Sequence, residues 1–206
     1  MSVRIKCCGM FRPEDIVAVN AALPDYCGFV VNFPKSHRSV TPQQCAALKA
    51  QLDPAVKAVG VFVDEDPQVV AALVNKGVLH VVQLHGHETA DYMQQLRGLC
   101  KAPLIKAYKI RNAADVQEAN ASTADMVLLD NGYGTGEQFD WSQAAGIQRP
   151  FMLAGGLTCE NLAAAIDALH PWGVDLSSGL ELNKVKDAEL IARAVSVVRN
   201  KEEAYD

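Results

Sequence analysis

Short apolar runs rich in β-branched residues recur along this chain, and each is followed by a longer segment whose apolar positions have helical spacing. The run at 58–63 is apolar on both faces, which is typical of a parallel strand covered by helices. The pattern predicts eight strands, near residues 3–8, 26–32, 56–63, 78–84, 103–108, 124–130, 150–154 and 173–177. It predicts eight helices, near 13–22, 41–52, 67–76, 88–98, 112–119, 140–146, 159–169 and 186–200.

Helix-start signals support this reading. Pro13 is followed by acidic residues, and Thr41 places a capping hydroxyl just before Pro42. No linker, low-complexity tract or block of like charge divides the chain. Eight uninterrupted βα units predict a single (β/α)₈ TIM barrel with parallel strands over residues 1–206, rather than an open doubly wound sheet.

Polar residues end several of the predicted strands, and a glycine follows each of them closely. Cys8 precedes Gly9, Asp130 ends the sixth strand, and Ser177 ends the eighth. Barrel enzymes build one site from the loops at the carboxyl ends of their strands, so we expect these groups to share a site.

Side-chain alternation along the strands predicts which polar groups point into the barrel. Lys6, Gln83, Asp130 and Asp175 fall on the inward face together with Cys8, whereas Cys7 faces the helices. Buried charges are costly unless paired, so one interpretation is a structural ion-pair cluster that fills the barrel. The other is the lining of a polar site, which the position of Cys8 and Asp130 at the open end favours.

Glycines also mark the loops after the seventh and eighth strands, where barrel enzymes commonly bind phosphate. Gly155 and Gly156 follow the seventh strand, and Ser177, Ser178 and Gly179 end and follow the eighth. Glycine lets backbone N–H groups approach an anion closely, so we predict a phosphate site there. A third glycine-rich loop at 132–136 either contacts a ligand, acts as a flap or is a plain connector.

Composition narrows the class of protein. Half of the 206 residues are hydrophobic, which suits one well-buried core, and the net charge of −5 argues against a general nucleic-acid or membrane-surface role. A bilayer span needs about 20 apolar residues in a row, and no run approaches that length. The first residues lack the apolar core of a signal peptide, so we expect a cytoplasmic protein.

Six cysteines without a secretory signal are expected to be reduced. Four of them sit among apolar or helical neighbours and are interpreted as small buried hydrophobic residues: Cys27, Cys45, Cys100 and Cys159. The histidines at 80, 85 and 87 lie close in sequence, but neither their spacing nor any CxxC motif supports a metal site. We therefore expect no metal.

Taken in order, the motifs resemble those of the phosphoribosylanthranilate isomerases. The resemblance rests on Lys6-Cys7-Cys8-Gly9, Gly28-Phe29-Val30, Ser36-His37-Arg38, Val59-Gly60-Val61-Phe62-Val63, Gln83-Leu84-His85-Gly86, Leu128-Leu129-Asp130, Gly134-Thr135-Gly136, Phe139-Asp140-Trp141, Leu153-Ala154-Gly155-Gly156-Leu157 with Asn161, Val174-Asp175-Leu176-Ser177-Ser178-Gly179 and Lys186-Asp187. It implies a cofactor-free Amadori rearrangement of N-(5-phosphoribosyl)anthranilate to 1-(2-carboxyphenylamino)-1-deoxy-D-ribulose 5-phosphate, the third step of tryptophan biosynthesis from chorismate. It also leads us to expect a monomer whose partner is this small phosphosugar-anthranilate.

The resemblance implies a role for each matching residue. Cys8 matches the family's general base, Asp130 its general acid, and Arg38 the arginine that holds the anthranilate carboxylate. The remaining residues expected to bind substrate are His85, Asp175, Gly134, Gly155, Gly156, Ser177, Ser178 and Gly179.

The chain departs from the family pattern at several positions. Cys7 stands where isoleucine is common, His37 and Ser39 replace proline and tyrosine beside Arg38, and Tyr133 and Lys184 each replace a glycine.

The chemistry requires an acid that opens the ribose ring and a base that removes the proton from the adjacent carbon. A thiol with an ordinary pKa near 8.5 is only a few per cent ionised at neutral pH. Lys6, two residues from Cys8, either lowers that pKa or pairs with Asp175 or Asp130.

Two alternatives belong to other classes. An indoleglycerol-phosphate synthase-like enzyme needs a catalytic lysine and a longer N-terminal extension, whereas the first strand here begins near Val3. A non-catalytic phosphosugar-binding regulator does not need Cys8 and Asp130, and both are present.

Overall fold

The structure is a computed structural model that describes residues 3–130, 144 and 146–205, without the side chains of 202–205. Parallel strands form a closed barrel whose sheet runs β1-β9-β8-β7-β6-β5-β4-β2, and β1 pairs with β2 to complete the circle. These strands are β1 (Arg4–Cys8), β2 (Tyr26–Val31), β4 (Lys57–Phe62), β5 (Val81–Leu84), β6 (Leu104–Lys109), β7 (Met126–Asp130), β8 (Phe151–Leu153) and β9 (Gly173–Leu176). The predicted parallel barrel is confirmed.

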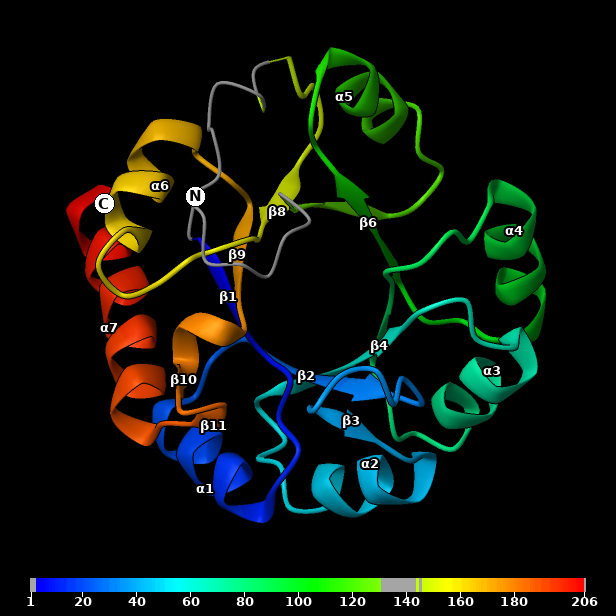
Figure 1. The fold of residues 1–206 in the computed structure, drawn as a ribbon, viewed down its shortest axis with the longest axis horizontal. Helices are drawn as coiled ribbons and strands as arrows, with labels where there is room; N and C mark the ends of the chain where they lie inside the picture. The colour runs from blue at the N-terminus through cyan, green and yellow to red at the C-terminus, as the bar shows by residue number, and fades with distance from the viewer. Residues whose placement is uncertain (1–2, 131–143, 145, 206) are drawn as a thin grey trace.

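Helices surround the barrel as an outer ring (Figure 1). They are α1 (Pro13–Ala22), α2 (Pro42–Lys49), α3 (Pro67–Asn75), α4 (Ala90–Leu99), α5 (Ala113–Asn120), α6 (Leu162–Leu169) and α7 (Ala188–Tyr205). The predicted start of α2 is confirmed, because Thr41 Oγ1 accepts a hydrogen bond of 3.2 Å from the N–H of Gln44. Residues 140–143 and 145 of the predicted helix at 140–146, and the candidate residue Gly134, lie outside the described residues.

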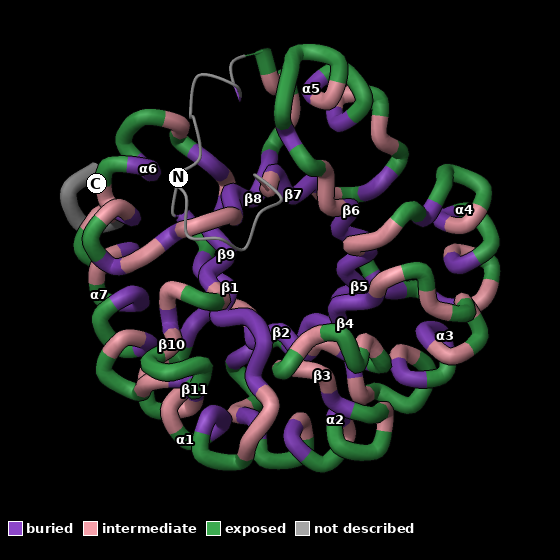
Figure 2. Tube along the Cα trace, viewed as in Figure 1, coloured by how far each residue is buried: buried purple, intermediate pink, exposed green. Residues whose placement is uncertain are grey.

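Apolar side chains pack in two places, inside the barrel and between the barrel and its helices. The interior cluster contains Val59, Val81, Ile105, Leu128 and Met152. The larger cluster fills the layer between strands and helices. Figure 2 shows the buried stretches concentrated along the strands and on the inner sides of the helices. This two-layer burial explains why the strands are apolar on both faces.

The barrel closes between its first and last strands, and a charged pair lies at this junction. Lys6 on β1 is in register with Asp175 on β9, and Lys6 Nζ lies 2.9 Å from Asp175 Oδ2. Their neighbours Cys7, Val174 and Leu176 pack in the helix-facing layer. The alternation predicted for these two strands is therefore the one observed.

The chain after β9 differs from the prediction. A 3₁₀ turn (Ser178–Leu180) leads into a hairpin of β10 (Glu181–Leu182) and β11 (Val185–Lys186). The predicted helix start at residue 186 is wrong, because Lys186 pairs with Glu181 across the hairpin and α7 begins only at Ala188. A further short strand, β3 (Ser39–Val40), adds to the sheet beside β2 and was also missed.

Candidate active site

Cys8 ends β1 at the carboxyl end of the barrel, and its side chain is only 6% exposed. The neighbouring strand leaves room for it through Gly28, since a Cβ atom there would lie 2.7 Å from Cys8 Sγ and 3.0 Å from Lys6 Cε. The close approach explains a glycine within an otherwise apolar strand. The thiol therefore occupies a tightly shaped space beside the lysine.

Burial raises the pKa of the Cys8 thiol above its ordinary value, and the Asp175 carboxylate raises it further. Lys6 acts in the opposite direction, as the sequence suggested, but it does not outweigh these two effects. The adjacent Cys7 lies wholly in the helix-facing layer, where burial raises its pKa to about 12. Cys7 is therefore unsuited to act as a base near neutral pH.

Lys6 serves both roles that the sequence left open. Its side chain is fully buried and is hydrogen-bonded to Asp175. Burial lowers the pKa of Lys6, but the charges of Asp175 and Cys8 outweigh burial and keep that pKa above its ordinary value. A permanent ammonium group thus lies beneath the thiol, where it can stabilise a thiolate when one forms.

Asp130 ends β7, and its side chain is 18% exposed. Its Oδ2 lies 3.4 Å from Nε2 of His85, which follows β5. The other ring nitrogen of His85, Nδ1, lies 3.0 Å from Nε2 of Gln83. The structure thus brings together His85 and Asp130, which the sequence had placed in one site without contact.

Arg38 lies in the loop after β2 and reaches the site beside Gly9. A Cβ atom on Gly9 would lie 2.5 Å from Arg38 Cδ and 3.1 Å from Ser177 Oγ, so the glycine makes this approach possible. Arg38 donates from Nε and Nη2 to the two carboxylate oxygens of Glu181. The guanidinium is therefore held in one orientation by a bidentate pair.

Sequence reasoning missed Glu181, which organises this side of the site. Besides its pair with Arg38, Glu181 has two further contacts: its Oε1 lies 2.8 Å from Lys186 Nζ, and its Oε2 lies 3.4 Å from His37 Nε2. Burial raises the pKa of Glu181, but the hydrogen bonds from Arg38 and Lys186 outweigh it and lower that pKa to about 2. The signal available in the sequence was Glu181 itself, an acidic residue that lies in a predicted loop, five residues before Lys186.

The two candidate phosphate loops are in contact. Gly155 and Gly156 have positive φ angles of 86° and 67°, and Asn161 Nδ2 donates to the Gly156 carbonyl at 2.9 Å. A Cβ atom on Gly179 would lie 2.0 Å from the Leu157 carbonyl oxygen, so only glycine permits this packing. The loops after β8 and β9 thus form one surface, as a shared anion site requires.

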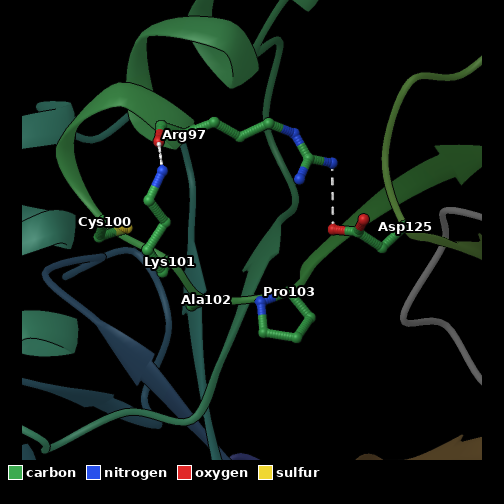
Figure 3. A pocket seen from close by; sticks show the side chains of 6 residues that line it. All are labelled: Arg97, Cys100, Lys101, Ala102, Pro103 and Asp125. Atoms are coloured by element: carbon green, nitrogen blue, oxygen red, sulfur yellow. Dashed lines mark hydrogen bonds and ion pairs between the residues drawn. The ribbon is translucent and has the colours of Figure 1, made fainter.

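A hollow of about 450 Å³ lies elsewhere, at the amino ends of β6 and β7 (Figure 3). It is lined by Arg97, Cys100, Lys101, Ala102, Pro103 and Asp125. Arg97 Nη2 pairs with Asp125 Oδ2 at 3.0 Å, so its charge is already compensated. This hollow is remote from Cys8 and Asp130, which lie at the carboxyl ends of their strands.

In residues 3–130, 144 and 146–205, no three His, Cys, Asp or Glu side chains are grouped so as to hold a metal ion. Within the same residues, every helix is too short or too polar to cross a bilayer. All six cysteines are free and buried, which agrees with the interpretation of Cys27, Cys45, Cys100 and Cys159 as small buried hydrophobic residues.

The chain is similar to known proteins over almost its whole length. Residues 5–197 match the family model of N-(5'-phosphoribosyl)anthranilate (PRA) isomerase. The chain is 40% identical over 201 residues to the N-(5'-phosphoribosyl)anthranilate isomerase of Clostridium kluyveri, covering 96% of this chain and 98% of that one. It is 37% identical over 202 residues to the Endomicrobium trichonymphae isomerase, with the same coverage of 96% and 98%.

Solved structures agree. Phosphoribosyl anthranilate isomerase from Thermotoga maritima matches with a TM-score of 0.87 and 33% identity, covering 96% of this chain and 99% of that one. A phosphoribosyl anthranilate isomerase in complex with reduced 1-(o-carboxyphenylamino)-1-deoxyribulose 5-phosphate matches with a TM-score of 0.84 and 32% identity, with coverage of 96% and 99%. With its motifs, fold and full-length relatives in agreement, the chain belongs to the N-(5'-phosphoribosyl)anthranilate isomerase family.

Proposed function

We propose that this isomerase rearranges N-(5'-phosphoribosyl)anthranilate with Asp130 as general acid and Cys8 as general base. The observation that carries this assignment is that both groups end barrel strands at the same, carboxyl end. That end is where barrel enzymes assemble their sites. The solved relative holds a reduced form of the expected product, which is consistent with this substrate class.

The first step opens the ribose ring. Asp130 donates its proton to the ring oxygen, the bond from that oxygen to C1' breaks, and the oxygen keeps the electron pair. The lone pair of the anthranilate nitrogen forms a C=N bond to C1', which gives a protonated Schiff base. Asp130 is left as a carboxylate whose Oδ2 lies 3.4 Å from Nε2 of His85.

The second step moves a proton from carbon. The Cys8 thiolate removes the proton from C2', a C1'=C2' bond forms, and the electrons of the Schiff base return to nitrogen. The resulting enolamine tautomerises to the ketone. The fully buried Lys6 ammonium stabilises the thiolate that this step requires.

Arg38 is proposed to bind the anthranilate carboxylate. Its Nε and Nη2 atoms already donate to Glu181, which leaves the Nη1 group as the proposed donor to that carboxylate. The ribose phosphate is proposed to bind the joined loops at Gly156, Ser178 and Gly179. We also propose a monomeric, cytoplasmic enzyme, which sedimentation and cell fractionation would test.

The assignment of Asp130 is tested by Asp130→Asn, because an amide can accept a hydrogen bond but cannot deliver the proton. We expect kcat to fall by about 10²–10⁴, the usual contribution of a positioned acid. The Kd of the reduced product analogue should change little, because its carboxylate and phosphate anchors lie elsewhere. Loss of substrate fluorescence gives kcat, and titration calorimetry gives Kd.

A structural role for Asp130 predicts a different result. If its side chain only supports the following loop, Asp130→Asn should retain more than about a tenth of kcat, which lies outside the range for a lost acid. Ser178→Ala serves as the matched control, since we expect it to weaken analogue binding without removing the acid.

A further inference from the structure

Gln83, His85 and Asp130 form a chain of side chains that crosses the barrel mouth from β5 to β7. Gln83 Nε2 lies 3.0 Å from His85 Nδ1, and His85 Nε2 lies 3.4 Å from Asp130 Oδ2. The second distance is longer than an ordinary hydrogen bond, and such contacts commonly tighten when substrate binds. The chemistry described so far gives Gln83 no role.

The surroundings of Gln83 are apolar. Its side chain is 1% exposed, and its register partners on the adjacent strands are Val61 and Ile105. Gln83 Oε1 has no hydrogen-bond partner. The contact that the Gln83 amide makes with another side chain is the one between its Nε2 and His85 Nδ1. Burying an amide is costly unless it is hydrogen-bonded, so a merely space-filling residue here is expected to be apolar.

We propose that Gln83 is a positioning residue that fixes the tautomer of His85. An amide NH₂ group can only donate, so the His85 Nδ1 that it faces must accept. A neutral imidazole then carries its single proton on Nε2, the nitrogen that faces Asp130.

The tautomer decides what Asp130 can do, a consequence that rests on the proposed function. With the proton on His85 Nε2, the ring donates a hydrogen bond to Asp130 Oδ2, so the acidic proton is carried on Oδ1, from which it is transferred to the ribose ring oxygen. After that transfer, the same N–H stabilises the new carboxylate. With the opposite tautomer, the Nε2 lone pair would accept the proton of Asp130 and compete with the substrate.

The loop that carries His85 is held firmly enough for this alignment. The His85 backbone N–H donates to the Phe62 carbonyl at 2.8 Å. The next residue, Gly86, donates to Glu88 Oε2 at 2.9 Å, and its carbonyl accepts from Lys106 Nζ at 2.7 Å. These bonds fix the backbone, so the imidazole's orientation and tautomer depend on Gln83.

The direct test is nitrogen-15 NMR of the His85 ring in the wild-type enzyme, at a pH where the ring is neutral. Long-range proton–nitrogen correlations distinguish the two tautomers without reference to activity. We expect the proton on Nε2. A proton on Nδ1 would overturn the proposal, because Gln83 would then be accepting through its oxygen.

Variants connect the tautomer to the rate. Gln83→Glu replaces the donor with a carboxylate, which can only accept, so His85 should move its proton to Nδ1 or become doubly protonated. With its proton on Nδ1, His85 accepts the Asp130 proton through Nε2, whereas doubly protonated His85 favours the Asp130 carboxylate. Both forms therefore lower the fraction of Asp130 that can act as the acid. We expect kcat to fall by about 10- to 100-fold, less than the full worth of the acid, with KM little changed.

Two further variants separate positioning from packing. Gln83→Met keeps the volume but loses the donor, so its NMR spectrum should show mixed tautomers and its kcat should fall. Val61→Ala, at the register partner of Gln83, removes apolar packing alone and should keep both tautomer and kcat. If Gln83→Met or Gln83→Glu keeps wild-type kcat, or if Val61→Ala loses as much, the proposal is wrong. A wild-type enzyme with the Nε2 proton but no isomerase activity would instead refute the proposed function.

Discussion

At the scale of single residues, two adjacent thiols have different environments because successive side chains of a strand point to opposite faces. Cys8 faces the barrel beside Lys6, and Cys7 packs in the layer beneath the helices. The same chemical change at each position should therefore have different effects.

Cys8→Ser should abolish nearly all activity, because a hydroxyl is a far poorer base than a thiolate at neutral pH. Cys7→Ser should lower the free energy of unfolding by about 1–3 kcal/mol, since it buries a hydroxyl in an apolar layer, yet keep kcat close to wild type. Steady-state kinetics and urea unfolding of both variants provide the check. Equal losses of kcat would show that the wrong thiol has been assigned.

The pH dependence of the reaction follows from the raised pKa of Cys8. The thiol is protonated below that pKa, so kcat/KM should rise as pH increases through the alkaline range. Asp175 contributes to the raised pKa, and Asp175→Asn should therefore shift the rising limb to lower pH. Profiles of kcat/KM for the two enzymes measure the shift, and a shift to higher pH would contradict the electrostatic account.

At the scale of elements, the hairpin of β10 and β11 is strained at its turn. Asn183 and Lys184 have φ angles of 52° and 64°, a pair of left-handed residues that suits a two-residue turn. Asparagine tolerates this region, whereas lysine does so at a cost. The position where Lys184 replaces the family's glycine is thus a backbone position that favours glycine.

Lys184→Gly should raise the free energy of unfolding by about 1 kcal/mol, because it removes the steric cost of the Cβ atom. Lys184→Ala removes the same charge but keeps the Cβ atom, so it should not stabilise. Thermal and urea unfolding of both variants would show the difference. Equal stabilities would mean that the turn is relaxed with lysine.

At the scale of the whole molecule, the buried Lys6–Asp175 pair links the first and last strands of the barrel. Asp175 raises the pKa of Lys6, so the stability from this group is complete below the unfolded lysine value of about 10.4. It is lost only as pH rises above that value. Lys6 therefore remains charged throughout the physiological range.

Lys6→Met should cost about 3–5 kcal/mol of stability, because it leaves the Asp175 carboxylate buried without its counter-ion. The double variant Lys6→Met/Asp175→Leu should recover most of that loss, since an apolar pair of similar volume carries no such penalty. Urea unfolding of the three proteins tests this. A double variant no more stable than Lys6→Met would show that the loss comes from packing.

The sequence by itself determined the barrel and the general location of its site. Eight apolar runs separated by helical segments are enough to predict the barrel. A strand that is apolar on both faces must be covered on both, and a closed parallel barrel provides that cover. Alternation along β1 and β9 was enough to place Cys8 and Asp175 inside the barrel and Cys7 outside it. The boundaries of most helices followed from local signals such as Thr41 and Pro42.

Only the tertiary structure decided which polar groups meet. Glu181 was missed because its partner Arg38 lies on a different loop, after β2, and strand alternation says nothing about contacts between loops. Its other partner, Lys186, is brought opposite it by a hairpin that the sequence pattern did not predict. Gln83 could be placed inside the barrel from its strand, but its contact with His85 depends on the turn that ends β5. The pKa of Cys8 depends on burial and on Asp175, a residue 167 positions away in sequence. Electrostatic effects act through space, so they become calculable only when the fold has brought these charges together.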